Sequence, residues 1–322
     1  MLALIAALVF YLLAPALLQA QPHVAQVGIL LPDSDRPQSQ IVKGFKDGLS
    51  ELGYQEGKNI IIETVNAKGD RSGLQPAALA LIAKKVDALV TYGTRASRVA
   101  QAASRQTPIV FIHPGDPFAL GLAKNTQGSA TNSTGVAGLA MQMTEERLNL
   151  LKKIVPEVQR VLIFYDANNQ YSRENARLAE TAARRLDLQV GLNGIKAADE
   201  LRATVGALQE RPQDAIFHVP DDLVETEARY IFKVARTKKL PTMFTEEVWA
   251  INGALAAYGP SYQGMGRQAA RLVDKIIKGQ KPASLPVERA AKFDLTLNYR
   301  TANFIGVQLS PELLEMANIV IR

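Results

Sequence analysis

The chain has 322 residues, of which 47% are hydrophobic and 21% charged, which is enough to bury a sizeable core and to form two domains. Its formal net charge of +6 is spread over many mixed-charge segments, so no basic patch indicates nucleic-acid binding. Cysteine is absent, which excludes a disulfide framework, a thiolate nucleophile and a lipid-carrying cysteine.

The first twenty residues, Met1 to Ala20, are apolar and carry no charged side chain. A stretch of this kind is typical of an export signal, and we predict a signal peptide at residues 1–22. An uncleaved membrane anchor is the alternative, because the usual basic start of a signal is missing. From the export signal we expect a periplasmic or otherwise extracytoplasmic protein. No later segment approaches the ~20 apolar residues of a membrane span.

Short apolar runs alternate with amphipathic helices in the first part of the chain. The runs at 27–31, 59–65, 88–92 and 109–112 are predicted strands, and the third is followed by a helix from Ser97. Strands that are apolar on both faces and separated by helices indicate a parallel sheet covered on both sides.

The same pattern restarts after residue 140. Thr144 is a suitable N-cap for a helix that ends before Pro156. Helices then separate further predicted strands at 161–165, 188–192, 215–219, 241–244 and 254–258. We therefore expect an α/β fold of two doubly wound parallel-sheet lobes with a cleft between them.

Ligands of open α/β sheets bind beyond the carboxyl ends of the strands, so the loops at those ends are the candidate sites. In the first lobe the candidate ligand-binding residues are Asp33, Ser34, Tyr92, Thr94, Arg95, Ser97 and Asp116. At 93–97, hydroxyls and free N–H groups at a helix N-terminus form a cradle for a carboxylate or phosphate. Helix capping by Ser97 alone is the alternative.

In the second lobe the candidate ligand-binding residues are Tyr171, Asp221, Asp222 and Glu246. A carboxylate at a strand end can pair with a ligand ammonium in a water-poor cleft. For one of the two aspartates, initiation of the following helix is the favoured alternative. Aromatic side chains here can stack on a flat ligand, although we expect Tyr165 to pack in the core.

Signals for catalysis are weak. The histidines His23, His113 and His218 lack the spacing of a metal site, and each is expected to be structural or incidental. No phosphate loop, dinucleotide fingerprint or nucleophile elbow occurs. We therefore expect a protein that is not an enzyme and holds neither a metal nor a cofactor.

Two segments carry a family resemblance. Residues 115–122 and 132–138 resemble the Asp-Pro, Gly-Leu and Asn-x-Thr-Gly succession of ABC-transporter solute-binding proteins, in the type I family with tryptophan/tyrosine-type members. Gly44-Phe45 and residues 266–270 support this resemblance, which covers most of 24–322. A different sequence stands at 126–131, where the family has Pro-Gly-Gly.

The resemblance implies a first lobe of residues 24–140 and 259–281 and a second lobe of 141–258 and 290–322. It implies a monomeric receptor that closes over an amino acid, aromatic or branched, or a related carboxylate, and delivers it to an ABC permease with a separate ATPase. A ligand-sensing module that feeds a membrane sensor is the alternative. A cleft enzyme that uses Asp116, Asp221 or His113 is a third interpretation.

Overall fold

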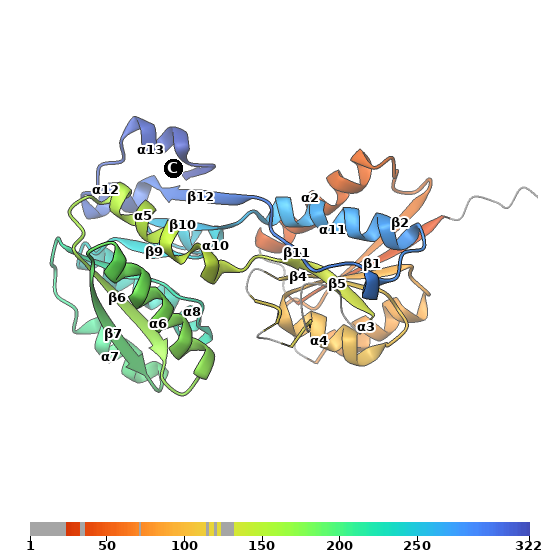
Figure 1. Ribbon diagram of the computed structural model, residues 1–322, viewed down its shortest axis with the longest axis horizontal. Coiled ribbons are helices and arrows are strands. Elements are labelled where there is room, and N and C mark those ends of the chain that lie inside the picture. Colours follow the sequence, from red (N-terminus) through yellow and green to blue (C-terminus); the bar gives the residue numbers. More distant parts are fainter. Residues whose placement is uncertain (1–23, 33–35, 71, 114–115, 119–120, 124–131) are drawn as a thin grey trace, which may run out of the picture.

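The computed structural model describes residues 24–32, 36–70, 72–113, 116–118, 121–123 and 132–322. These residues form two α/β lobes that lie side by side (Figure 1). Each lobe has one sheet, in which parallel pairing dominates, and helices pack on it from both faces. The predicted fold class is confirmed.

The first lobe contains a six-stranded sheet in the order β11-β5-β4-β3-β1-β2. Its strands are β1 (Ala25–Leu31), β2 (Ile60–Asn66), β3 (Ala88–Tyr92), β4 (Ile109–His113), β5 (Ser133–Ala137) and β11 (Glu288–Arg289). The helices on one face are α2 (Arg36–Glu51) and α11 (Tyr262–Ile277). On the other face lie α3 (Leu74–Ala83) and α4 (Gly93–Ala103).

The helices α2 and α11 pack closely because glycines lie at their contact. A Cβ atom at Gly44 would lie 2.1 Å from the carbonyl oxygen of Gln263. One at Gly266 would lie 2.3 Å from that of Ile41. No other residue type permits this approach, so the glycines fix a late segment of the chain onto the first lobe.

The second lobe contains a seven-stranded sheet in the order β13-β12-β10-β9-β8-β6-β7. Its strands are β6 (Arg160–Asp166), β7 (Gln189–Ile195), β8 (Asp214–Phe217), β9 (Thr242–Phe244), β10 (Ala256–Pro260), β12 (Phe293–Asn298) and β13 (Ile319–Ile321). The pairing of β10 with β12 is antiparallel, and the other pairs are parallel.

Helices cover both faces of this second sheet. One core holds α5 (Thr144–Ile154), α6 (Gln170–Arg185), α12 (Tyr299–Ile305) and α13 (Pro311–Met316). The helices of the other face are α7 (Ala198–Gly206), α8 (Asp222–Thr226), α9 (Ala228–Thr237) and α10 (Glu247–Ile251). Short 3-10 helices lie at η1 (Ala140–Met143) and η2 (Pro282–Ser284).

The chain passes between the sheets from β5 through η1 to α5, from β10 to α11, and from β11 to β12. The last two passages are adjacent, because β10 and β12 pair up to Pro260 and Phe293. The Ser261 N–H then donates to the carbonyl of Lys292 at 2.9 Å. The two lobes are thus joined by neighbouring extended segments (Figure 1).

Some predicted element boundaries are wrong. The helix expected from Ser97 begins at Gly93, whose φ of +77° is accessible to glycine. Thr144 is not an N-cap: it lies inside α5, and its hydroxyl donates to the Met141 carbonyl at 2.8 Å. Strand β10 starts two residues later than the predicted 254–258.

The predicted signal peptide at residues 1–22 lies outside the described part of the chain. Among the residues described, none of the helices combines the length and the apolar character that crossing a membrane requires.

Candidate functional site

The carboxyl ends of the parallel strands in both lobes lie at the junction between the lobes. Strand β5 ends where the chain leaves for the second lobe, and β10 ends where it returns. Strands β1, β3 and β4 run parallel to β5, and β6, β8 and β9 run parallel to β10. We call these two sets of strand ends, with the loops that follow them, the first-lobe edge and the second-lobe edge.

At the first-lobe edge, the N-terminus of α4 is not capped by the side chain of its N-cap residue, Tyr92. The first N–H groups of this helix point out of its end and suit an anion. Thr94 is half-buried, and its Oγ1 lies 2.8 Å from Nε2 of His113 on the neighbouring strand. Arg95 is exposed.

Ser97 has a different position from the one predicted. It is fully buried in the second turn of α4, where its hydroxyl donates to the Gly93 carbonyl at 2.7 Å. The same hydroxyl lies 2.8 Å from Oγ1 of Thr91. The alternative that Ser97 caps this helix is therefore wrong, and the ligand-binding role of Ser97 stays a prediction.

Asp116 of the first lobe and Tyr171 of the second lobe are linked electrostatically. The Asp116 carboxylate accepts a hydrogen bond from the Phe118 N–H at 2.8 Å. Tyr171 is half-buried in the first turn of α6, and burial raises its pKa, with a further increase from the negative charge of Asp116. Asp33 and Ser34 lie outside the described residues.

At the second-lobe edge, Asp221 initiates a helix. Its Oδ1 accepts from the Val224 N–H at 3.0 Å and caps α8, while its Oδ2 accepts from the Asp166 N–H at 2.7 Å. Of the two aspartates, Asp221 is therefore the one that initiates the following helix. Asp222, the next residue, is exposed in the first turn of the same helix.

Glu225 and His218 are not among the predicted site residues. His218 follows β8, its side chain is 0% exposed, and its Nε2 lies 3.7 Å from Oε1 of Glu225. Its ring stacks on Phe244 with centroids 4.5 Å apart and planes 3° from parallel. The sequence gives no signal for this role of His218, because the histidine meets its partners only when β8, α8 and β9 pack together.

Arg147 lies behind His218. Its guanidinium is fully buried, donates to the His218 carbonyl at 2.7 Å and lies 4.8 Å from the ring centre of Phe217. No described Asp or Glu forms an ion pair with it, and burial lowers its pKa to about 9. The sequence places Arg147 in an amphipathic helix, where an arginine is usually exposed.

Glu246 links the second-lobe edge to the first lobe. It accepts a hydrogen bond from the hydroxyl of Tyr262, which begins α11 and is 2% exposed. The Tyr262 ring meets that of Tyr92 edge to face, with centroids 6.3 Å apart. Burial raises the pKa of Tyr262 well above its usual range, and the charge of Glu246 adds to this.

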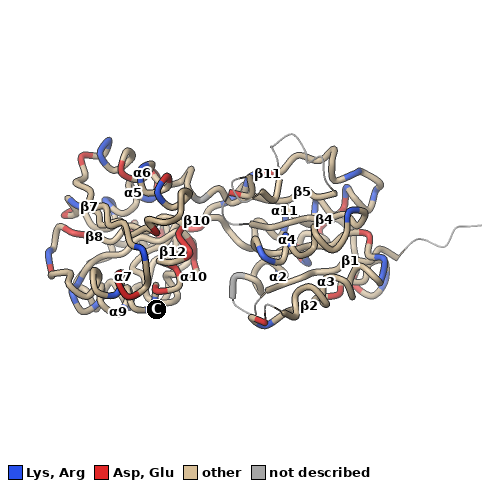
Figure 2. Tube along the Cα trace, turned by 90° about the horizontal axis from the view of Figure 1, so that it is seen from below, with Lys and Arg blue, Asp and Glu red and all other residues tan. Residues whose placement is uncertain are grey.

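Aromatic and acidic side chains lie together at the second-lobe edge. The half-buried Trp249 has its ring centre 6.1 Å from that of Phe244 and 6.4 Å from that of His218. Its indole Nε1 is buried without a hydrogen-bond partner. In Figure 2, acidic segments near α10 lie toward the first lobe. Tyr165, in contrast, packs against the core as expected.

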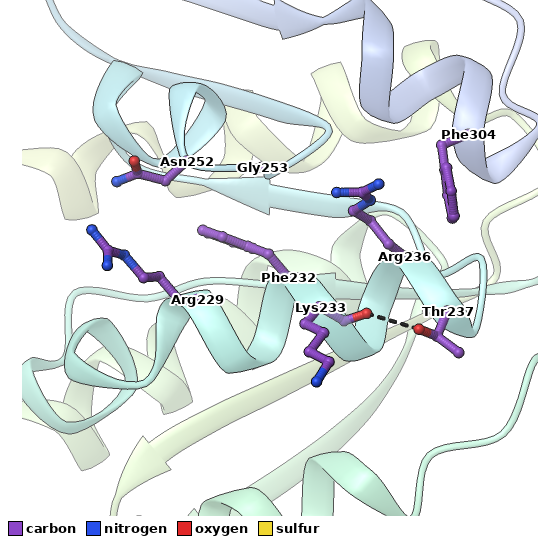
Figure 3. A pocket seen from close by; sticks show the side chains of 8 residues that line it. All are labelled: Arg229, Phe232, Lys233, Arg236, Thr237, Asn252, Gly253 and Phe304. Carbon is purple, nitrogen blue, oxygen red and sulfur yellow. Dashed lines mark hydrogen bonds between the residues drawn. The ribbon is translucent and has the colours of Figure 1, made fainter.

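A pocket of about 340 Å³ lies on the second lobe alone, between α9, the end of α10 and α12 (Figure 3). Arg229, Lys233 and Arg236 project from α9, and Arg236 lies 4.4 Å from the ring centre of Phe304. This pocket receives no residue from the first lobe, so it does not belong to the junction. The described residues include no group of three or more His, Cys, Asp or Glu side chains suited to a metal ion.

Two lobes with facing strand ends, joined by extended segments, define the class of two-lobed binding proteins. The family of ABC transporter substrate binding proteins matches residues 26–321, and the chain belongs to this family.

Two proteins similar to this chain are described with a ligand, tyrosine in one case and L-Trp in the other. The tyrosine-binding protein of Clostridioides difficile (strain R20291) is 25% identical over 266 residues, which cover 83% of this chain and 76% of that protein. A crystal structure described as an ABC domain from Streptococcus pneumonia in complex with L-Trp has a TM-score of 0.74 at 24% identity. The ligand-free, open structure of a substrate binding protein from Clostridium difficile has a TM-score of 0.78 at 24% identity. Each of these two matches covers 92% of this chain and 99% of the other chain. The two clostridial proteins are described as binding proteins.

Proposed function

We propose that this protein is the extracytoplasmic receptor of an ABC importer and that it captures an aromatic amino acid between its two lobes. The observation that carries this proposal is the opposite chemistry of the two edges. The first-lobe edge offers the uncapped N-terminus of α4, and the second-lobe edge offers carboxylates beside aromatic rings. A zwitterion with an aromatic side chain matches both edges.

In this proposal the ligand carboxylate meets the N–H groups at the start of α4, with Thr94 and Arg95 beside them. The amino group faces the second-lobe edge, and the ring lies near Tyr92 and Trp249. Tyrosine and tryptophan binding by relatives supports the choice of an aromatic ligand. Asp33 and Ser34 stay predicted contacts.

Closure of the lobes is the proposed mechanism of capture. Contacts with both edges exist together only when the lobes approach, so the ligand stabilises the closed state by the difference in affinity between the two states. A permease then recognises the closed form, and a separate ATPase supplies the energy. The receptor works as a monomer, without nucleic acid, after export by the signal at residues 1–22.

Trp249 makes this proposal directly testable, because it is the single tryptophan of the chain. We expect its fluorescence to change on addition of L-tyrosine or L-phenylalanine, and calorimetry to give one site. At one hundred times its Kd, such a ligand raises the unfolding free energy by about 2.7 kcal/mol. Branched amino acids, acidic amino acids and sugars serve as comparison ligands. The absence of binding to L-tyrosine, L-phenylalanine and L-tryptophan would refute the proposal.

A further inference from the structure

The pocket on the second lobe has a basic wall. Arg229, Lys233 and Arg236 line it from α9, and their spacing of four and three residues places them on one side of the helix. Asn252 lies across from α9, and Phe304 lies at one end of the pocket (Figure 3). Among the described residues that line the pocket, none is an Asp or a Glu. The pocket therefore presents positive charge without negative charge beside it.

These three cations have no acidic partner in the part of the chain that the structure describes. At the start of α9, Glu227 instead accepts two hydrogen bonds from Arg202, at 2.7 and 3.1 Å. Just beyond the end of the helix, Lys239 pairs with Glu210 at 2.9 Å. The charges at both ends of α9 are thus balanced within the protein, whereas those in the pocket are available to an external anion.

Arg236 is held in place by an exposed aromatic ring. Its guanidinium carbon lies 4.4 Å from the ring centre of Phe304, which is 57% exposed. A cation above a ring uses the flat face of the guanidinium, so the N–H donors in its plane stay available. Pairs of such donors match two oxygens of a phosphate group. Phe304 therefore positions Arg236 for a phosphate.

The length of the basic wall indicates an elongated anion. Arg229 and Arg236 are seven residues apart, and seven residues of α-helix advance by about 10 Å. Their side chains lie toward opposite ends of the pocket, with the ring of Phe232 between them (Figure 3). In these positions a single phosphate or carboxylate is too short to meet both, whereas a linear chain of phosphates carries charge along its whole length. The volume of about 340 Å³ lies within the range of small-molecule sites.

We propose that this pocket binds a linear polyphosphate chain, either free or as part of a nucleoside triphosphate. Arg229 and Arg236 bind phosphates at the two ends of the chain, and Lys233, one turn from each, adds positive charge between them. No covalent bond forms or breaks. The site lies on the second lobe alone, so this inference does not depend on the proposed function.

The test is calorimetry of the natural protein with sodium tripolyphosphate, at low ionic strength and without divalent cations. We expect one site, with an affinity that decreases as salt is added. Arg229→Gln and Arg236→Gln should each bind at least about 5-fold more weakly, because each removes a charge-assisted hydrogen bond. Unfolding curves confirm that the variants are folded.

Arg177→Gln is the matched control. Arg177 is an exposed arginine of α6, which covers the opposite face of the second sheet from α9. In the described part of the chain it has no ion pair either. The variant lowers the net charge by the same amount, and its affinity should stay within about 2-fold of the natural protein, because salt screens distant charges.

ATP distinguishes the two sources of the phosphate chain. If the ligand is a nucleotide, ATP binds more tightly than tripolyphosphate, because the base stacks on the open face of Phe304. Phe304→Leu then weakens ATP binding more than tripolyphosphate binding. Equal affinities, with equal effects of Phe304→Leu, assign the pocket to free polyphosphate. Both results support a site for a phosphate chain.

Other outcomes overturn the inference. One is that neither tripolyphosphate nor ATP binds, even if vesicles of phosphatidylglycerol do, which would assign the basic wall to a membrane surface. Another is that Arg177→Gln weakens binding as much as Arg236→Gln, which would indicate general charge attraction. Displacement of tripolyphosphate by L-tyrosine would place the anion at the junction between the lobes. Because L-tyrosine binding is measured separately, failure of this inference and failure of the proposed function are distinguishable.

Discussion

At the residue scale, the partial burial of Glu225 among carboxylates has a cost to the fold. Its side chain is only 29% exposed, and burial with neighbouring carboxylates disfavours its charged form. Because the pKa is raised on folding, the stability that Glu225 contributes is present at low pH and is lost as the pH rises through the pKa of the folded state. The ligand-free protein therefore carries an unfavourable charge at high pH.

We expect Glu225→Gln to stabilise the ligand-free protein at pH 8 by on the order of 1 kcal/mol, since one pKa unit corresponds to about 1.4 kcal/mol. At pH 4, where both forms are neutral, the gain should vanish. Urea unfolding at the two pH values measures it. Equal effects at both would contradict a charge-based origin.

Tyr262 joins the lobes through a single hydroxyl. Tyr262→Phe keeps the ring contact with Tyr92 but leaves Glu246 without this donor. Glu246 is half-buried, and a hydrogen bond to a charged group contributes about 1.5–3 kcal/mol. We expect a decrease of this size in the unfolding free energy, measured by urea denaturation.

Tyr258→Phe is the matched control for Tyr262→Phe. Tyr258 is half-buried, and its ring lies 5.9 Å from that of Phe293. No side-chain hydrogen bond of Tyr258 is found among the described residues, so this variant should lose much less stability. Equal losses in the two variants would show that the bond to Glu246 has no special role.

At the element scale, the start of α4 depends on Gly93. A residue with a Cβ at φ +77° costs about 1–2 kcal/mol and would turn the first N–H groups away from their present direction. We expect Gly93→Ala to weaken L-tyrosine binding at least about 10-fold in calorimetry and to change tyramine binding little, because tyramine lacks the carboxylate.

Gly57→Ala provides the control for this helix end. Gly57 has φ +81° and, like Gly93, would place an added Cβ in open space. It follows α2 on the way to β2, near the amino-terminal end of the first sheet. The same loss of stability with unchanged L-tyrosine binding is expected. Equal weakening by both variants would show that the effect of Gly93 is general destabilisation.

The strands were predictable because each buries a continuous apolar run, whereas several helix starts were not. The predicted strands at 27–31, 88–92 and 109–112 agree closely with β1, β3 and β4. The start of α4 was missed because Gly93 adopts a positive φ that no periodicity reveals. Thr144 has the composition of an N-cap, yet its hydroxyl bonds to Met141 within the turn.

At the scale of the whole molecule, the sequence indicated two lobes and an acidic side of the site but not its most unusual contacts. Asp222 and Glu246 stand within a few residues of the ends of β8 and β9, which is a local signal. Arg147 and His218 are 71 positions apart, and they meet only through the packing of α5 on β8. Contacts of this kind depend on the assembled sheet, so the spacing of residues in the sequence does not reveal them.

We expect ligand binding to make the whole molecule more compact. If the lobes close over the ligand, the radius of gyration in small-angle X-ray scattering should fall on addition of L-tyrosine. An unchanged radius with a saturated site would contradict closure and would leave binding itself intact.

The order of the strands also has a consequence for folding during synthesis. The first lobe needs α11 and β11, and the second needs β12 and β13, so both take essential pieces from residues 262–322. A ribosome that has made the first 200 residues has therefore released no complete lobe. Both lobes reach their final packing only after residues 262–322 have been made, and a premature stop near residue 260 deprives both of part of their core.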